Sequence, residues 1–390
     1  MAESILRSNR ADFNRDASRA RLSSKAPIRH LDMSLIPIVA LLTAAGCLAI
    51  RSASGRLLQV RGGDVNFYLK RQVIYFALAS IIFVITLLFD YRFLRDYAPL
   101  LLGAGVLMLV IVLTPLGNTQ AGAQRWIDFG VLQVQPAEIM KMVIVAALGA
   151  MLAGERGVHS FSQVVWAMVL VLIPASLVYV QPDLGTVMVF LAIAFGVLLI
   201  AGTRVRWLLV IVLAGVVAIV GVLQLGILKD YQVARLTAFM DTSADLQRTG
   251  FNLAQSKIAI GSGGFQGKGL GNGSQTNLNY VPEQHTDFIF TAIGEEQGFL
   301  GGVAIIGLFA LLLWRSLRIA TLSKDKFGTL LAAGVAAMFG FQLFVNIGMT
   351  VGIMPITGIP LPFVSYGGSS LITSYFGVGV LMNIHMRRFV

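Results

Sequence analysis

An aspartate at the head of a long apolar stretch is the residue of this chain best placed for acid–base chemistry. Asp287 follows His285 and Thr286 and opens the mostly apolar run 286–314. Ionisable groups beside a bilayer are costly, so they are candidates for function. Partial desolvation in a cleft would raise the pKa of a carboxyl toward the range of a general base. The structural alternative, compatible with the first, is that Asp287 or Thr286 caps the following helix.

Further ionisable residues lie inside or beside apolar runs. On a helix that begins near Asp287, Glu295 would lie about 12 Å further along and would need a partner or water. Pro136 suits a helix start, and Glu138 and Lys141 follow it at i,i+3 spacing. These two residues form either a self-contained ion pair or a site at which Lys141 meets an anionic substrate.

Two short motifs flank these charged residues. Arg125 and Trp126 offer a cation and an amphipathic ring at interface level, although Trp126 is equally well explained as a membrane anchor. Only Gln181 and Pro182 separate two apolar runs, which predicts a tight helical hairpin. Asp183 is expected to cap the second helix of that hairpin rather than to act in catalysis.

The segment 358–370 combines prolines and glycines with several hydroxyl side chains. This composition predicts a fixed, non-helical, re-entrant path, and such backbone at membrane depth must face protein or a cavity. The hydroxyl groups could line that cavity or only satisfy backbone groups; they belong to Ser365, Tyr366, Ser369 and Ser370.

The composition places these residues in a membrane protein. Of 390 residues, 56% are hydrophobic and 13% charged, with a mean hydropathy of +0.78; soluble domains have about 25% charged residues. The net charge of +11 could suggest nucleic-acid binding. However, the basic residues are scattered over loops between apolar runs, and this distribution fits a membrane topology better. The single Cys47 excludes an internal disulfide. We predict an all-α polytopic fold of about ten transmembrane helices, near 34–52, 72–89, 98–116, 136–153, 162–180, 183–201, 206–228, 286–314, 329–353 and 367–386.

Lysine and arginine residues set the predicted orientation. The tail 1–33 carries seven of them and is expected to be disordered, cytoplasmic and in contact with anionic lipid headgroups. The remainder, 34–390, would form the transmembrane domain, with both termini cytoplasmic. A large loop, about 229–285, would lie outside between helices 7 and 8. One outer loop departs from the charge rule, since it holds Arg51, Arg56, Arg61, Lys70 and Arg71.

The two long outer loops, 117–135 and 229–285, are candidates for function because of their length. Within the second, 246–260 shows a weakly amphipathic helical pattern and 261–273 is rich in glycine, which predicts turn or coil. A phosphate-binding loop is not indicated, because Gly269 stands where Ser or Thr is needed. The sequence also shows no His/Cys cluster with metal-ligand spacing.

Taken together, five motifs in this order resemble the SEDS family (shape, elongation, division and sporulation). The resemblance covers about residues 35–388, nearly the whole chain. The motifs are Arg125-Trp126-Ile127, Gln135 to Glu138 with Lys141, Gln181 to Thr186, Pro282 to Phe290 with Gly294-Glu295-Glu296, and Pro360 to Ser370.

The resemblance implies a peptidoglycan glycosyltransferase that polymerises lipid II, with Asp287 as the essential catalytic residue. Asp287 would deprotonate the acceptor hydroxyl, and a cation would stabilise the departing pyrophosphate. That cation would be Lys141, Arg125, Arg235 or a divalent ion such as Mg²⁺ or Mn²⁺. The candidate substrate-binding residues are Lys141, Glu138, Arg125, Trp126, Arg235, His285, Glu295, Ser365 and Ser369.

Within the family, 275–280 and 358–363 look more like the elongation branch than the division branch. That branch implies a role in rod shape in the bacterial inner membrane. Its implied partners are a class B penicillin-binding protein, MreC and MreD. The alternatives are a polymerase of the division branch, a lipid II flippase or transporter, and a non-catalytic scaffold.

Overall fold

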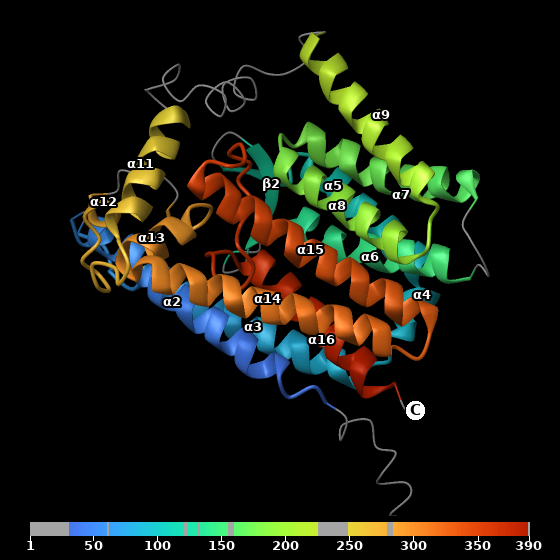
Figure 1. The fold of residues 1–390 in the computed structure, drawn as a ribbon, viewed down its shortest axis with the longest axis horizontal. Helices are drawn as coiled ribbons and strands as arrows, with labels where there is room; N and C mark the ends of the chain where they lie inside the picture. The colour runs from blue at the N-terminus through green and yellow to red at the C-terminus, as the bar shows by residue number, and fades with distance from the viewer. Residues whose placement is uncertain are drawn as a thin grey trace, which may run out of the picture.

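The computed structural model (Figure 1) describes residues 31–60, 62–120, 123–128, 130, 133–154, 160–224, 249–278 and 284–388. Within these ranges the chain is mostly helical. The helices are α2 (Leu35–Val60), α3 (Phe67–Leu88), α4 (Arg92–Asp96), α5 (Ala98–Val112), α6 (Pro136–Ala153), α7 (Phe161–Val180), α8 (Leu184–Ile200), α9 (Val205–Gln224), α11 (Thr249–Ser262), α12 (Ser274–Asn277), α13 (Ile289–Glu296), α14 (Gly298–Leu322), α15 (Lys326–Val351) and α16 (Gly368–Met386).

Helices lie in each of the ten predicted apolar runs, although their ends differ from the predicted ones. Six of the described helices are long and apolar enough to cross a membrane, namely α2, α3, α6, α7, α14 and α15. Shorter apolar helices are α5, α8 and the first part of α9. The chain is therefore a helical, polytopic membrane protein, as predicted.

The centre of the bundle is formed by α6, α15 and α16, which bury residues on all of their faces. By contrast, α3, α7 and α14 expose large apolar side chains, including Ile81, Leu172 and Leu311. An outward apolar surface on a bundle of apolar helices is what a lipid environment requires. Figure 1 shows α2, α3, α14 and α16 running side by side in the lower half of the view, with α15 next to α14 across the middle.

The prediction of an all-α fold was wrong in one place. The predicted outer loop 117–135 contains an antiparallel sheet of order β1-β2-β3, with β1 (Gly117–Gln120), β2 (Ala123–Asp128) and β3 (Gln133–Val134). Asn118 pairs with Trp126, and Ile127 pairs with Val134. These strands are two to six residues long, too short for the alternation that reveals a strand in a sequence.

The predicted span 286–314 is two helices, α13 and α14, and it ends at Leu322. The break falls at Gly298, whose φ of +66° is left-handed and whose added Cβ would lie 2.3 Å from the backbone nitrogen of Gly267. The glycine-rich loop therefore packs into the break. Phe288, and not Asp287 or Thr286, holds the N-cap position of α13, which starts at Ile289.

Several local predictions were confirmed. The tight hairpin joins α7 and α8, and the Asp183 side chain caps α8 by accepting from the Thr186 N–H at 3.2 Å. Pro136 begins α6, and α11 occupies most of the predicted amphipathic segment 246–260. The predictions for residues 1–30, and for 225–248 and 279–283 of the large loop, lie outside the described residues.

Candidate active site

A cleft of 610 Å³ collects most of the residues singled out in the sequence. It lies at the end of the bundle where α3, α6, α8 and α16 begin. Its walls come from these helix ends, from the small sheet, and from the segments before α13 and α16. Its lining includes Asp287, His285, Glu138, Arg125, Trp126, Asp183, Arg71, Tyr68, Gly358, Pro360 and Ser370.

The backbone around Asp287 is fixed by hydrogen bonds to three successive carbonyl groups. The Tyr366 N–H donates to the carbonyl of His285 at 3.0 Å. The Ser365 hydroxyl donates to the carbonyl of Thr286 at 2.5 Å. The Asn346 side chain donates to the carbonyl of Asp287 at 2.8 Å. Because each carbonyl is held, the direction in which the Asp287 side chain leaves the chain is set by the fold.

Asn346 also joins the two segments that form this part of the cleft. It is completely buried on α15, and its amide donates a second hydrogen bond to the carbonyl of Ile359 at 2.7 Å. One side chain therefore clamps the Asp287 segment to the re-entrant segment that precedes α16. Asn346 was not predicted from the sequence as a site residue. The available signal was a pair of amides, Gln342 and Asn346, within the apolar run 329–353, since polar groups at such depth need partners or a function.

The structure shows how Glu138 and Lys141, for which two interpretations were open, lie relative to each other. Lys141 Nζ lies 2.6 Å from Glu138 Oε1, and the two side chains are 1% and 4% exposed. The predicted ion pair is therefore present and buried. Glu138 lines the cleft, whereas Lys141 is not among the lining residues.

Arg125 ties the small sheet to the hairpin between α7 and α8. Its guanidinium donates to the carbonyl of Gln181 at 3.0 Å and also to that of Pro182. It lies 3.9 Å from the carboxylate of Asp183, which further accepts from the Gln135 amide at 3.1 Å. Arg125 and Trp126 both line the cleft, so a cation and an aromatic ring stand at its wall.

A second cation and an aromatic cluster face the cleft from α3. Arg71 lies over the Phe67 ring at 4.9 Å. The rings of Tyr68 and His285 have centroids 4.4 Å apart, and the Tyr366 ring packs against Tyr68 at 5.0 Å. From the sequence, Arg71 was noted only as one of the basic residues in an outer loop that depart from the charge rule. That departure could have identified Arg71 as a candidate site residue, because basic residues are otherwise concentrated on the cytoplasmic side.

The remaining predicted site residues either lie away from the cleft or form hydrogen bonds with backbone groups. Glu295 is fully buried away from the cleft, where its carboxylate accepts from Lys268, Ser274, Gln275 and Thr276 and so holds the glycine-rich loop. The Ser365 hydroxyl donates to the carbonyl of Thr286, as described above. The Ser369 hydroxyl accepts from the Gln135 N–H at 2.9 Å and donates to the carbonyl of Gln133 at 3.1 Å. Arg235 lies outside the described residues.

The chemistry available in the cleft is proton transfer beside bound anionic groups. Asp287 provides a carboxylate, and Arg71 and Arg125 provide guanidinium groups suited to phosphate oxygens. Within the described part of the chain, no three His, Cys, Asp or Glu side chains gather closely enough to hold a metal ion by themselves.

Known proteins resemble this chain over nearly its whole length. A family model described as "Cell cycle protein", covering FtsW, RodA and SpoVE, matches residues 32–389. A probable peptidoglycan glycosyltransferase FtsW from Geobacter sp. (strain M18) is 38% identical, covering 92% of this chain and 98% of the relative. The peptidoglycan glycosyltransferase MrdB of Escherichia coli (strain K12) is 36% identical, with 92% and 94% covered.

A solved structure gives the same result in three dimensions. It comes from work on the coordination of polymerization and crosslinking by a peptidoglycan synthase complex. Its matching chain superposes with a TM-score of 0.77 and 31% identity, over 92% of this chain and 98% of that one. With the family model, the relatives and the fold in agreement, this chain belongs to the SEDS family of FtsW, RodA and SpoVE proteins.

Proposed function

We propose that this chain is a peptidoglycan glycosyltransferase that polymerises lipid II, with Asp287 as its general base. Family members of known name carry this activity. The observation that carries the proposal is the cleft in which the clamped Asp287 shares the lining with two arginines.

In the proposed reaction the Asp287 carboxylate takes the proton from the 4-hydroxyl of the acceptor N-acetylglucosamine. The oxygen attacks the anomeric carbon of the donor N-acetylmuramic acid from the face opposite the leaving group. The bond from that carbon to the pyrophosphate breaks, undecaprenyl pyrophosphate leaves, and inversion gives a β-1,4 linkage. Negative charge grows on the pyrophosphate, where Arg71 and Arg125 would stabilise it.

The cation assignment changes with the structure. Lys141 is engaged by Glu138, so its charge is already compensated. A divalent ion such as Mg²⁺ or Mn²⁺ stays a proposal; it would bind mainly to substrate phosphates, with Asp287 or Glu138 as protein ligand. It would add positive charge at the leaving group.

The proposed topology has ten spans, both termini in the cytoplasm and the cleft at the outer face. Support comes from helices in all ten predicted runs. At 1.5 Å per residue, the 15 residues of α5 extend about 22 Å and the 17 residues of α8 about 26 Å, against the ~30 Å of a hydrocarbon core. The loop between α9 and α13 would then lie outside, beside the cleft.

Among family members we favour the elongation branch, RodA, on the segments 275–280 and 358–363. Overall sequence identity does not separate the branches, because this chain is 38% identical to an FtsW and 36% identical to MrdB. A class B penicillin-binding protein is the proposed partner, supported by the synthase complex that contains the matching fold. MreC and MreD are proposed as further partners. If this chain belongs to the elongation branch, depleting it from cells should make them round, whereas loss of a division polymerase should produce filaments.

The decisive experiment is polymerisation of fluorescent lipid II by the purified full-length protein, with and without its penicillin-binding partner. Wild type should form glycan chains, and a folded Asp287→Asn variant should form none above background. Equal product from both would remove Asp287 from the mechanism. No product from wild type, even with the partner, would turn attention to lipid translocation and to a scaffold role.

A further inference from the structure

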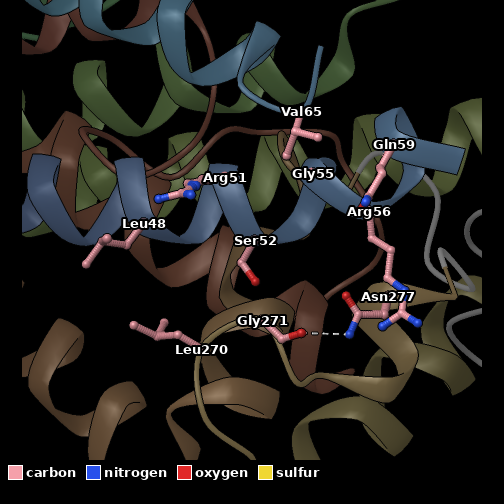
Figure 2. A pocket seen from close by; sticks show the side chains of 10 residues that line it. All are labelled: Leu48, Arg51, Ser52, Gly55, Arg56, Gln59, Val65, Leu270, Gly271 and Asn277. Carbon is pink, nitrogen blue, oxygen red and sulfur yellow. Dashed lines mark hydrogen bonds between the residues drawn. The ribbon is translucent and has the colours of Figure 1, made fainter. Parts of the chain in front are cut away.

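A second pocket, of 530 Å³, lies beside the outer part of α2 and apart from the Asp287 cleft. Six residues of α2 form one wall, and three residues of the loop before and within α12 form the other (Figure 2). Val65 belongs to this pocket, whereas Phe67, two residues later, belongs to the cleft. The α2–α3 connection therefore lines this pocket, and the start of α3 lines the cleft. The lining is Leu48, Arg51, Ser52, Gly55, Arg56, Gln59, Val65, Leu270, Gly271 and Asn277.

The described lining of this pocket carries positive charge. Among the described residues that line it, Arg51 and Arg56 are the only ionisable ones. Among the described residues neither guanidinium forms an ion pair or a hydrogen bond, whereas nearby Lys70 is paired with Asp64 at 2.5 Å. Two arginines at one pocket without a protein counter-charge leave donors for an anion.

Neutral donors and a rigid wall complete the polar part. Figure 2 shows the Arg56 side chain reaching from α2 toward the loop that carries Asn277. The Asn277 amide donates to the carbonyl of Gly271 at 2.8 Å, which fixes the loop wall. Gln59 adds a further amide group on the α2 side.

One buried carboxylate, that of Glu296, contacts the walls of this pocket without lining it. Glu296 is 2% exposed, and it accepts from the Ser52 hydroxyl and from the backbone N–H groups of Gly271 and Gly273. It is not a lining residue. Its contacts hold the loop against α2, so the carboxylate supports the pocket walls from behind instead of supplying a counter-ion to the arginines.

The position of the pocket along α2 matches the level of lipid phosphates. Arg51 and Arg56 lie sixteen and twenty-one residues after Leu35, about 24 and 32 Å along the helix. An apolar core is about 30 Å thick, so the two arginines bracket the depth at which headgroups begin. Leu48 and Leu270 line the same pocket and are 50% and 54% exposed, which provides an apolar wall next to the cations.

We propose that this pocket binds the phosphate group of an amphiphilic lipid, with Arg51 and Arg56 on the phosphate and Leu48 and Leu270 against the lipid chain. The inference goes beyond the proposed function, since it rests on a site separate from the cleft. Two sources share this chemistry, an anionic membrane phospholipid and a polyprenyl diphosphate. The site also explains two of the arginines that break the charge rule.

The test is binding of dioctanoyl phosphatidylglycerol to the delipidated full-length protein in detergent, measured by native mass spectrometry. Arg51→Gln/Arg56→Gln should bind it at least about tenfold more weakly than wild type. The matched control, Arg204→Gln/Arg206→Gln, removes two exposed arginines from the opposite end of the bundle and should stay within about twofold. Arg51→Lys/Arg56→Lys should recover part of the loss, because lysine keeps the charge but not the bidentate geometry.

Competition distinguishes the sources. Displacement by farnesyl diphosphate at far lower concentration than phosphatidylglycerol would assign the polyprenyl source, and the reverse would assign the phospholipid. Displacement by inorganic phosphate as effective as either lipid would overturn the amphiphile assignment. The same loss in both double variants, or wild-type binding of dioctanoylglycerol as tight as of phosphatidylglycerol, would overturn the site itself.

Discussion

The carboxylate of Asp287 lies against the backbone of Gly358, so closely that a Cβ atom on Gly358 would stand 3.2 Å from Oδ2 of Asp287. Gly358 also has a φ of +76°, in the left-handed region. The re-entrant segment therefore needs glycine here for two reasons, its own conformation and the space taken by the carboxylate. Both residues line the cleft.

We expect Gly358→Ala to lower lipid II polymerisation at least tenfold, because the methyl group would shift the Asp287 carboxylate by a few tenths of an ångström, and misplacement by 1 Å can cost about a hundredfold. Gly62→Ala is the matched control. Gly62 has a similar φ of +70° but nothing within 4 Å of an added Cβ, so its variant carries backbone strain of about 1–2 kcal/mol without crowding. Equal polymerisation by the two variants would show that the contact with Asp287 is unimportant.

A second prediction concerns Asn346, which clamps the carbonyls of Asp287 and Ile359. Asn346→Ala should reduce kcat with little change in KM, because the general base loses its orientation while the substrate surfaces stay. Leaving buried carbonyls without donors should also cost about 1–3 kcal/mol of stability.

Asn383→Ala separates these effects. Asn383 is 1% exposed and donates to the carbonyls of Thr86 and Phe89, at the end of α3 that lies opposite the cleft. It should lower the melting temperature similarly but leave kcat close to wild type. If kcat fell to the same extent in both variants, Asn346 would be a stability residue only.

The sequence could predict contacts between residues that are close together along the chain. The Asp183 cap, the hairpin at Gln181 and Pro182, and the Glu138–Lys141 pair each involve residues within a few positions of one another. Such arrangements follow from helix geometry and capping alone. Helical ranges were also predictable, because apolar runs of sufficient length have few other solutions in a membrane.

Contacts between distant segments could not be predicted. Asn346 is 59 residues from Asp287, and the carboxylate of Glu295 meets Gln275 and Thr276 twenty and nineteen residues away. Glu295 was assigned to substrate binding because a buried carboxylate needs partners. Those partners are loop groups, and only the folding of the glycine-rich segment into the break at Gly298 brings them together.

The buried pair Glu138–Lys141 gives a third prediction. Removing one charge leaves the other uncompensated, so Lys141→Met should destabilise the protein by about 3–5 kcal/mol. The double variant Glu138→Gln/Lys141→Met should regain most of that stability in thermal unfolding. Polymerisation should stay low in the double variant, because Glu138 also lines the cleft. Recovery of both stability and polymerisation would assign the pair to the fold alone.

The last prediction concerns acid stability and Asp325, which caps α15 at the opposite end of the bundle. Burial alone would raise the pKa of this carboxyl, but hydrogen bonds from Tyr91 at 2.7 Å, the Gly328 N–H at 2.7 Å and Arg92 at 3.2 Å outweigh it and hold the pKa below the ordinary 3.8. A lowered folded-state pKa stabilises the protein above the ordinary value and stops doing so as pH falls through the folded value.

Asp325→Asn should therefore melt well below wild type at about pH 7, and the gap should close as the pH falls through about 4 toward the lowered value. Asp64→Asn is the control. The pKa of Asp64 is also lowered, chiefly by Lys70, but that ion pair is exposed and screened, so its removal should change the melting temperature little at any pH. A gap for Asp325→Asn that stays constant down to about pH 3 would show that the cap stabilises α15 without its charge.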